Sequence, residues 1–345
     1  MIPWLVASAV ALAPWNPIKM VCDADIHAAR NRWLRALLLL GIAWFAWQGA
    51  AWLAILAFWC LVRWRSMELH GPLLGWVAVA ATWGLLRTLP ETAWIWLPWA
   101  WLAGAVYHVA WCLVLQRADW SAVKRRSWGR RTKGLLGSPV VSSFYFVLLA
   151  PFCPWWGWPL LAIGLYLTCS WTAFLALGVA LIWVHPDSWL LGALGTAGGI
   201  LAVVLTRLTG WRVLERTPRG DSPDGLWSRV AMMRCLLRGW WRDGHRWFGC
   251  GPGSLKTAGR LWGSRSVREL PIGEAHNEPL QVLYEYGLVG LVGVLAFAAP
   301  IVWHLRLGDP WAAAWVAGAV ISLVHWPWRH PVLGLMLLTI SARLI

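Results

Sequence analysis

The chain has 345 residues, of which 59% are hydrophobic and 13% are charged, and its mean hydropathy is +0.56. Soluble domains are about 45–50% apolar and about 25% charged, so this composition excludes an ordinary soluble enzyme and predicts an integral membrane protein. The 30 Lys and Arg outnumber the 15 Asp and Glu, which gives a net charge of +15, and only four of the basic residues are lysines. Because arginine suits phosphate and carboxylate, an anionic substrate is one interpretation of this excess. A GC-rich genome is the other, and we interpret most of the 34 tryptophans as interface anchors.

Apolar stretches recur along the whole chain. They lie near residues 2–15, 34–62, 73–86, 94–115, 139–153, 155–170, 172–184, 189–208, 282–305, 311–326 and 331–345. A membrane span needs about 20 apolar residues; several stretches are shorter, and 34–62 is long enough for a hairpin broken at Gln48-Gly49. We therefore expect an all-α polytopic membrane protein with about ten or eleven transmembrane helices. The apolar Met1–Ala13 lacks a basic region and predicts a membrane segment rather than a cleaved signal peptide.

Two hydrophilic segments divide the chain. Residues 116–137 carry seven basic groups and one acid, and residues 210–280 carry twelve basic and seven acidic groups. Four parts follow, listed here with their boundaries: N-terminal helices with a basic loop (1–137), central helices (138–209), a long active-site loop (210–280) and C-terminal helices (281–345). We expect the long loop to pack onto the membrane core as a lid. The positive-inside rule would place both segments in the cytoplasm, but that rule weakens for long loops and for arginines that bind substrate.

An amphipathic helix is predicted inside the long loop. Ser222-Pro223 suits a helix start, and Leu226–Trp241 has helical periodicity. Arg229 falls on the apolar face of this helix, whereas Arg234, Arg238 and Arg242 form a stripe on the opposite side, which predicts a solvated or headgroup-facing surface. A guanidinium on a buried face is costly unless it meets an anion. Arg229 is therefore a candidate anion ligand, with snorkelling to solvent as the structural alternative.

The end of the long loop holds the candidate chemistry. The glycine-rich run Gly249–Ser254 is either a tight turn or a backbone concavity in which Gly251 and Gly253 present amides to an anion. It has neither the Rossmann nor the P-loop pattern. Asn277 suits a helix N-cap with Pro279 in the first turn, so His276 would lie beside a helix N-terminus, where a neutral imidazole able to accept a proton is favoured. A purely structural histidine is the alternative.

The helix that follows Asn277 contains further candidates. Gln281 and Glu285 lie at i and i+4 on one face, and a carboxyl within a membrane helix is a functional candidate. Gly287, Gly290 and Gly293 predict a face for close helix packing. Cys235 and Cys250 are the two cysteines that share a hydrophilic segment and could form a disulfide. The sequence has no CxxC and no Cys/His cluster with zinc spacing, so no metal site is expected.

Together these motifs resemble the O-antigen ligase and O-antigen polymerase family. The resemblance covers about residues 135–345 and is carried by ordered segments, listed here: Gly134–Pro139, the Arg229 helix, Arg246–Leu255, Ala275–Asn277, Leu280-Gln281, Glu285, Gly287–Leu291 and Arg329–Pro331. It implies an all-helical, metal-independent glycosyltransferase of the bacterial inner membrane, with the long loop on the periplasmic or exterior side. The implied donor is a glycan on undecaprenyl pyrophosphate, and the implied acceptor is a hydroxyl of a saccharide or lipid A core.

The resemblance also implies residue roles. Arg229 would bind the diphosphate, and His276 would be the general base. Further substrate contacts would come from Arg234, Arg246, Gly251, Gly253, Asn277 and Glu285. Besides its donor, its acceptor and the lipid bilayer, the protein would need no cofactor, no metal and no nucleic acid.

One position departs from the family pattern. The family carries a Ser-Arg pair where a membrane helix reaches the active face, and the matching stretch here is Thr168–Ala173, with Trp171 in place of the arginine. Indole cannot pair with phosphate. Either a basic residue of 116–137 or of the long loop takes over this role, or the enzyme is altered or inactive.

Two other functions remain open. Asp23 and Asp25, after the first span, could serve a metal-dependent polyprenyl-phosphate sugar transferase, whose activity EDTA would abolish. A non-catalytic transporter or flippase of anionic lipids would explain both the arginine excess and Trp171. In a transporter, His276→Ala would leave function intact.

Overall fold

The computed structural model describes somewhat more than half of the chain. The described residues are 86–87, 89–122, 136, 139–168, 170–208, 226–242, 246–250, 254, 277–325, 327–329 and 331–345. They are 86% helical and contain no strands, so the all-α prediction is confirmed for this part of the chain. The predicted spans before residue 86, Asp23 and Asp25 lie outside it.

Nine α-helices are described, and most coincide with the predicted apolar stretches. Their bounds are α5 Glu91–Ala122, α6 Pro139–Leu149, α7 Trp158–Thr168, α8 Trp171–Val184, α9 Trp189–Leu208, α10 Leu226–Arg242, α13 Glu278–His304, α14 Pro310–Ser322 and α15 Pro331–Leu344. Short 3-10 turns occupy Ala150–Phe152, Trp155–Gly157, Pro186–Ser188 and Pro327–Arg329. Within the described residues, two helical stretches are long and apolar enough to cross a membrane: Glu91–Val114 of α5 and Glu278–His304 of α13. Proline and capping residues set several boundaries, since Asn277 and Asp309 each cap a helix with a proline in its first turn.

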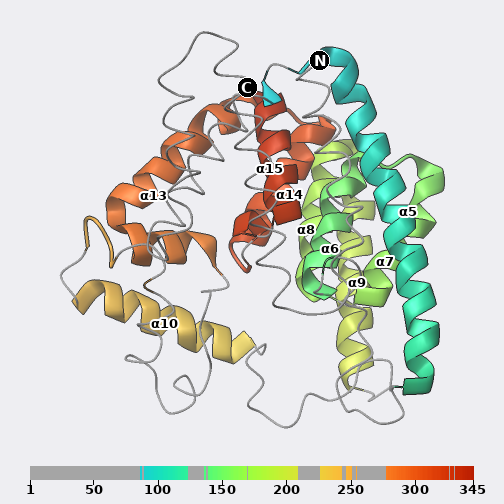
Figure 1. Cartoon of the computed structure of the whole chain (residues 1–345), viewed down its shortest axis with the longest axis horizontal. Coiled ribbons are helices and arrows are strands. Elements are labelled where there is room, and N and C mark those ends of the chain that lie inside the picture. The colour runs from blue at the N-terminus through green and yellow to red at the C-terminus, as the bar shows by residue number, and fades with distance from the viewer. Residues whose placement is uncertain are drawn as a thin grey trace, which may run out of the picture.

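A helix bundle contains α5, α6, α7, α8, α9, α14 and α15, and α14 packs against α6, α8 and α15 within it (Figure 1). α14 presents a row of small buried residues, Ala312, Ala313, Ala314, Ala317 and Gly318, to its neighbours α6, α8 and α15. Small side chains let helix backbones approach closely, which is the packing mode of helices in lipid. The α8–α9 contact works in the same way, because a Cβ on Gly178 would collide with Thr196 and a Cβ on Gly199 would collide with Phe174.

Aromatic side chains fill one end of this bundle. Trp311, in the first turn of α14, contacts Trp94, Trp101 and Phe152, at ring-centroid distances of 5.6, 6.2 and 4.7 Å. The Tyr145 hydroxyl donates to the Trp101 carbonyl at 2.5 Å, so the buried phenol is satisfied. These tryptophans serve as core packing in the described structure, not as interface anchors.

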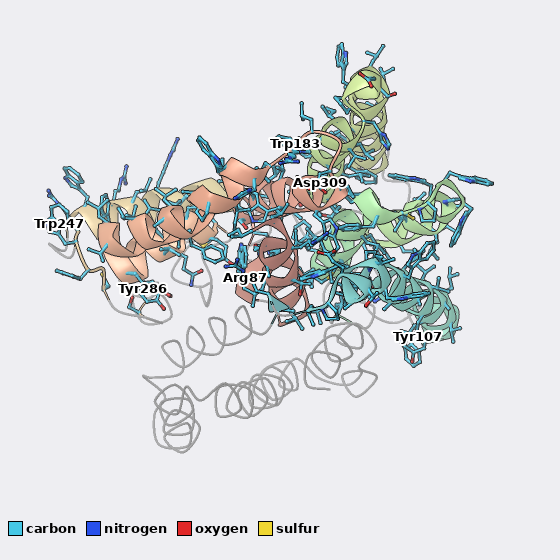
Figure 2. All side chains as sticks on the ribbon, turned by 90° about the horizontal axis from the view of Figure 1, so that it is seen from above. Arg87, Tyr107, Trp183, Trp247, Tyr286 and Asp309 are labelled. Carbon is cyan, nitrogen blue, oxygen red and sulfur yellow. The ribbon has the colours of Figure 1, made fainter. Side chains whose placement is uncertain are left out.

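Contacts between helix ends define two ends of the bundle. Arg343 at the end of α15 pairs with Glu91 at the start of α5 (2.9 Å), and Trp183 at the end of α8 donates to the Arg306 carbonyl (2.9 Å). Figure 2 shows Trp183 close to Asp309 at this end, which we call the far end. At the opposite end, the Asn277 side-chain amide donates to the Leu323 carbonyl at the end of α14 (2.7 Å).

The antiparallel helix order places both hydrophilic segments at that opposite end. α5 and α9 both start at the far end and run away from it, so both finish on the side of the bundle away from Arg343 and Trp183 (Figure 1). The chain therefore leaves toward 116–137 and toward 210–280 from the same end of the bundle, which we call the loop end.

The cap of α14 gives a stability test of this architecture. The Asp309 carboxylate accepts from the Trp311 amide at 2.9 Å. Asp309→Ala removes this bond and is expected to lower the free energy of unfolding by about 1 kcal/mol. Asp309→Asn retains an N-cap acceptor and is expected to stay close to the unsubstituted protein in thermal unfolding in detergent. Equal stability of the Ala and Asn variants would contradict the capping role.

Candidate functional site

The predicted helix of the long loop packs onto the first part of α13. α10 covers Leu226–Arg242, in agreement with the prediction over Leu226–Trp241. Its buried Met232 and Leu236 contact the buried Tyr284 of α13, with Trp240 and Cys250 packed around them. The described part of the long loop thus lies against a candidate membrane span, as expected of a lid.

The alignment of α10 along α13 gives the backbone position of Arg229. The Trp240 indole donates to the Arg246 carbonyl at 3.3 Å, and the Leu288 amide donates to the same oxygen at 2.9 Å. The end of α10 is therefore level with Leu288, whereas its middle is level with Tyr284. Arg229 lies one helical turn before Met232, on the same face and in the direction of the start of α13. The placement of the Arg229 side chain itself stays a prediction.

The other arginines of this region are at the surface. Arg234 and Arg238 are exposed on the side of α10 opposite Met232 and Leu236, as predicted for a polar stripe. The Arg246 guanidinium lies 3.9 Å from the centroid of the Trp241 ring and donates to the Trp241 carbonyl at 3.3 Å. Arg246 is thus held in place by its own loop.

α13 is broken at Gly287. This residue has φ 67° and ψ −162°, a conformation that only glycine adopts readily, so the helix consists of two halves. The segment 246–250 crosses the break. Its Arg246 and Trp247 carbonyls accept from Leu288 (2.9 Å) and Val289 (3.0 Å), and the Cys250 amide donates to the Tyr284 carbonyl (2.9 Å). Three loop hydrogen bonds therefore satisfy backbone groups that lie next to the break.

Two glycines make this contact sterically feasible. Gly249 has φ 71°, and a Cβ there would collide with the Glu285 peptide, while a Cβ on Gly287 would collide with Trp247. The expectation that Gly287 and Gly293 belong to one helix-packing face is wrong. Gly287 meets a loop backbone, and a Cβ on Gly293 would have no neighbour within 4 Å. The break at Gly287 changes the direction of the helix and so separates the two positions.

The start of α13 is fixed from two directions. Asn277 Oδ1 accepts from the Leu280 amide at 2.9 Å, which confirms the predicted N-cap. Its Nδ2 donates to the Leu323 carbonyl at the end of α14. His276, which immediately precedes this cap in the sequence, lies outside the described residues, as do Gly251 and Gly253.

Glu285 is enclosed just before the break. Its side chain is 2% exposed, and one carboxylate oxygen accepts from Gln281 Nε2 at 3.0 Å, so the predicted i, i+4 pair is formed. The Gly249 backbone lies against the Glu285 peptide. In this arrangement Glu285 is placed to support the loop crossing, and its carboxylate does not present a surface to solvent.

His325 is a loop-end residue that the sequence reasoning missed. It is buried two positions after Leu323, and its ring centroid lies 5.1 Å from that of Phe144 in α6. It therefore lies close to the Asn277–Leu323 contact. The only signal for it in the sequence was a single ionisable residue near the end of the apolar stretch 311–326.

The possible disulfide between Cys235 and Cys250 is not formed, since neither cysteine takes part in a disulfide bond. Cys250 packs near Met232 and Leu236 on the buried side of α10, whereas Cys235 occupies another position around the helix. Among the described residues, no group of three or more His, Cys, Asp or Glu could hold a metal ion.

Trp171, the departure from the family pattern, begins α8 directly after Ser170. α8 runs from the loop end to the far end, since its other end contacts Arg306 and Gly308. The start of α8 is therefore at the same end of the bundle as Asn277. Ser170 and Thr172 share a hydrogen bond of 3.0 Å there, between buried hydroxyls.

The site thus combines an arginine-bearing helix, a broken helix with a buried carboxyl, and a capped helix start next to His276. No family model, no curated protein and no solved structure matches this chain. Its chemistry is therefore argued from its own residues.

Substitution of the glycines tests the loop crossing. Gly287→Ala is expected to lower the free energy of unfolding by about 1–3 kcal/mol, because alanine is strained at this φ and ψ and its Cβ displaces Trp247. Gly249→Ala is expected to have a similar effect. Gly293→Ala, in open space on the same helix, is the control and is expected to be neutral or stabilising by up to about 1 kcal/mol. Equal thermal stabilities of Gly287→Ala and Gly293→Ala would contradict the proposed contact.

Proposed function

We propose that the protein is a membrane glycosyltransferase of the O-antigen ligase or polymerase type. It transfers a glycan from undecaprenyl pyrophosphate to a hydroxyl of a saccharide or lipid A core acceptor. The observation that carries this proposal is the packing of α10, with the Arg229 position on its buried side, against the half of α13 that starts at Asn277. In the proposal, Arg229 and His276 act together at the end of the bundle where α13 starts.

A multi-pass location in the bacterial inner membrane is part of the proposal. It is supported by the two candidate spans and by the outer surface of α13, where Val289, Val292, Leu295 and Trp303 are exposed. Contiguous apolar patches of this kind are unfavourable in water and mark contact with lipid or a partner. A bilayer would cover them at no desolvation cost.

The proposed reaction requires one cationic and one basic group. The bond between the anomeric carbon and the diphosphate oxygen breaks, and the diphosphate leaves with the bonding electron pair, stabilised by Arg229. The acceptor hydroxyl oxygen forms the new bond to the anomeric carbon, and its proton moves to His276. No metal is needed, because the guanidinium compensates the charge that develops on the leaving group.

The surrounding residues would position these groups. Asn277 holds the start of α13 against α14, and in the proposal His276, which precedes this cap in the sequence, takes up the proton of the acceptor. In the proposal Arg234, Arg246, Gly251 and Gly253 add contacts to the anionic donor. Glu285 and Gln281 maintain the broken helix on which α10 rests.

The loss of the usual arginine at Trp171 has a proposed compensation. The basic segment 116–137 leaves the bundle at the loop end, the end at which Trp171 begins α8. We propose that one of its seven basic residues provides the second phosphate contact.

A transporter or flippase is the competing function, and the break in α13 is the feature that favours it. Broken helices in transporters bind anions or cations at their free half-helix ends. Here the amides of Leu288 and Val289 already donate to the Arg246 and Trp247 carbonyls. These donors are used within the protein, so the break favours a structural role over an ion site.

Glycan analysis of a deletion strain tests the enzymatic proposal. Arg229→Ala and His276→Ala are each expected to reduce the transferred glycan by about 100-fold or more, the usual loss for a transition-state or acid–base group. Donor binding should survive in His276→Ala. Arg306→Ala, an exposed arginine at the far end, is the matched control and should restore the glycan fully. Full complementation by both site variants would refute the assignment, and complementation by His276→Ala alone would favour the transporter. Loss of activity in EDTA would favour the Asp23 and Asp25 alternative.

Thiol labelling tests the proposed periplasmic or exterior position of the loop end. In a cysteine-free variant, Ser264→Cys should react with a membrane-impermeant maleimide on intact spheroplasts. Asp187→Cys, exposed at the far end, should react only after permeabilisation. The reverse pattern would place the loop end in the cytoplasm and contradict the proposed orientation.

A further inference from the structure

The outer side of α10 carries a stripe that alternates arginine with apolar residues. Arg234, Leu237, Arg238 and Trp241 are exposed and stand at i, i+3, i+4 and i+7, which places them on one face of the helix. The opposite face, with Met232 and Leu236, is buried against α13. A solvated helix face would not need exposed Leu237 and Trp241, so this surface has an amphipathic character of its own.

The loop after α10 extends this surface with two more aromatic residues. Trp247 is 65% exposed and Phe248 is 77% exposed, and Figure 2 labels Trp247 at the outer edge of the arm that α10 and α13 form. The Val289 amide donates to the Trp247 carbonyl, so the tip adjoins the exposed Val289 and Val292 of α13. The aromatic tip thus continues the apolar surface of a candidate membrane span.

Positive charge accompanies the aromatic residues. All charged residues of Leu226–Arg242 and 246–250 are arginines. Arg246 stacks on the Trp241 ring, and Arg238 borders an open cavity of about 320 Å³ whose other lining residues are Leu237, Trp240 and Trp241. The combination of Trp, Phe and Leu with Arg is the composition of helices that lie in a membrane interface.

We propose that this surface, formed by Leu237, Arg238, Trp241, Arg246, Trp247 and Phe248, docks onto an anionic phospholipid leaflet. The inference rests on the membrane location in the proposed function. Trp247 and Phe248 enter the boundary between headgroups and acyl chains, where aromatic side chains are favoured. Arg238 and Arg246 contact lipid phosphates, because arginine forms paired hydrogen bonds with them.

The orientation of α10 agrees with this docking. α10 lies beside the bundle, below the first part of α13, and runs crosswise to α5 and α9 (Figure 1). If α5 crosses the bilayer, α10 extends roughly along the membrane surface, as an interfacial helix does. The Arg246 and Trp247 carbonyls accept hydrogen bonds from the first amides of the second half of α13. Docking of Trp247 and Phe248 on the membrane would therefore also hold the break in α13 in place. Arg229 would then be held at the depth of a lipid-linked diphosphate.

The experiment measures the depth of the tip in the full-length protein. A spin label is attached at Phe248→Cys in a cysteine-free variant reconstituted in nanodiscs of phosphatidylcholine with phosphatidylglycerol. The reported quantity is the ratio of collision rates with oxygen, which partitions into lipid, and with a water-soluble nickel chelate. Val292→Cys on α13 is the lipid reference, and Asp187→Cys at the far end is the aqueous reference.

We expect the ratio at position 248 to approach that at position 292 and to exceed that at position 187 several-fold. If the collision ratio at position 292 is that of a lipid-exposed site but the ratio at position 248 is that of a water-exposed site, the docking inference is wrong and the membrane location stands. If position 292 itself reads as water, the membrane location of the proposed function fails, and the docking fails with it. The two failures are therefore distinguishable.

Lipid charge gives the second arm of the test. Each arginine near an anionic surface contributes about fivefold to association. The ratio at position 248 should therefore fall in nanodiscs of phosphatidylcholine alone and should fall in Arg238→Gln with anionic lipid present. Arg306→Gln at the far end is the matched control and should change nothing. A ratio that is insensitive to both lipid charge and Arg238→Gln would overturn the contact with anionic phosphate.

Discussion

The break in α13 is the constraint on which the loop end depends. A helix interrupted inside a bilayer would leave backbone groups without partners, and each such group costs several kcal/mol in hydrocarbon. Here the segment 246–250 supplies two carbonyls and one amide at the break. These hydrogen bonds require the backbones of the loop and of α13 to approach closely at Gly249 and Gly287, where any side chain would collide. The loop is therefore attached to the bundle by main-chain bonds and not by side-chain contacts alone.

This attachment determines the position of the other candidate residues. Because Arg246 bridges Trp240 and Leu288, the end of α10 is level with the break, and its start points toward the beginning of α13. Asn277 fixes that beginning against α14. Arg229 and His276 come from distant parts of a polar loop, yet both are tied to the same half-helix. A loop that had no such attachment could not hold a diphosphate and an acceptor in a constant relative geometry.

The sequence was sufficient for features that depend on local periodicity and capping. The helices from α5 to α15 follow apolar stretches, the buried face of α10 follows its 3.6-residue pattern, and the Asn277 cap follows from residue type. The break at Gly287 could not be predicted, because in isolation Gly287, Gly290 and Gly293 resemble a packing face. Its cause lies in Gly249, which is remote in sequence. His325 was missed for the same reason, since its meaning depends on the tertiary contact between Asn277 and Leu323.

The location of positive charge follows from the same architecture. The positive-inside rule treats arginines in short loops as a signal of sidedness. In this chain both basic segments leave from one end of the bundle, and the described residues of the far end mix Arg306 and Arg343 with Glu91 and Asp309. If the arginines served only to set the orientation of the protein in the membrane, they could lie anywhere in the polar loops. In α10, Arg234 and Arg238 share an exposed face with Leu237 and Trp241, opposite the face that packs on α13. We infer that much of the excess charge serves anionic lipid, with Arg229 directed toward the diphosphate of a donor and Arg238 toward the phosphates of the leaflet in which that donor is embedded.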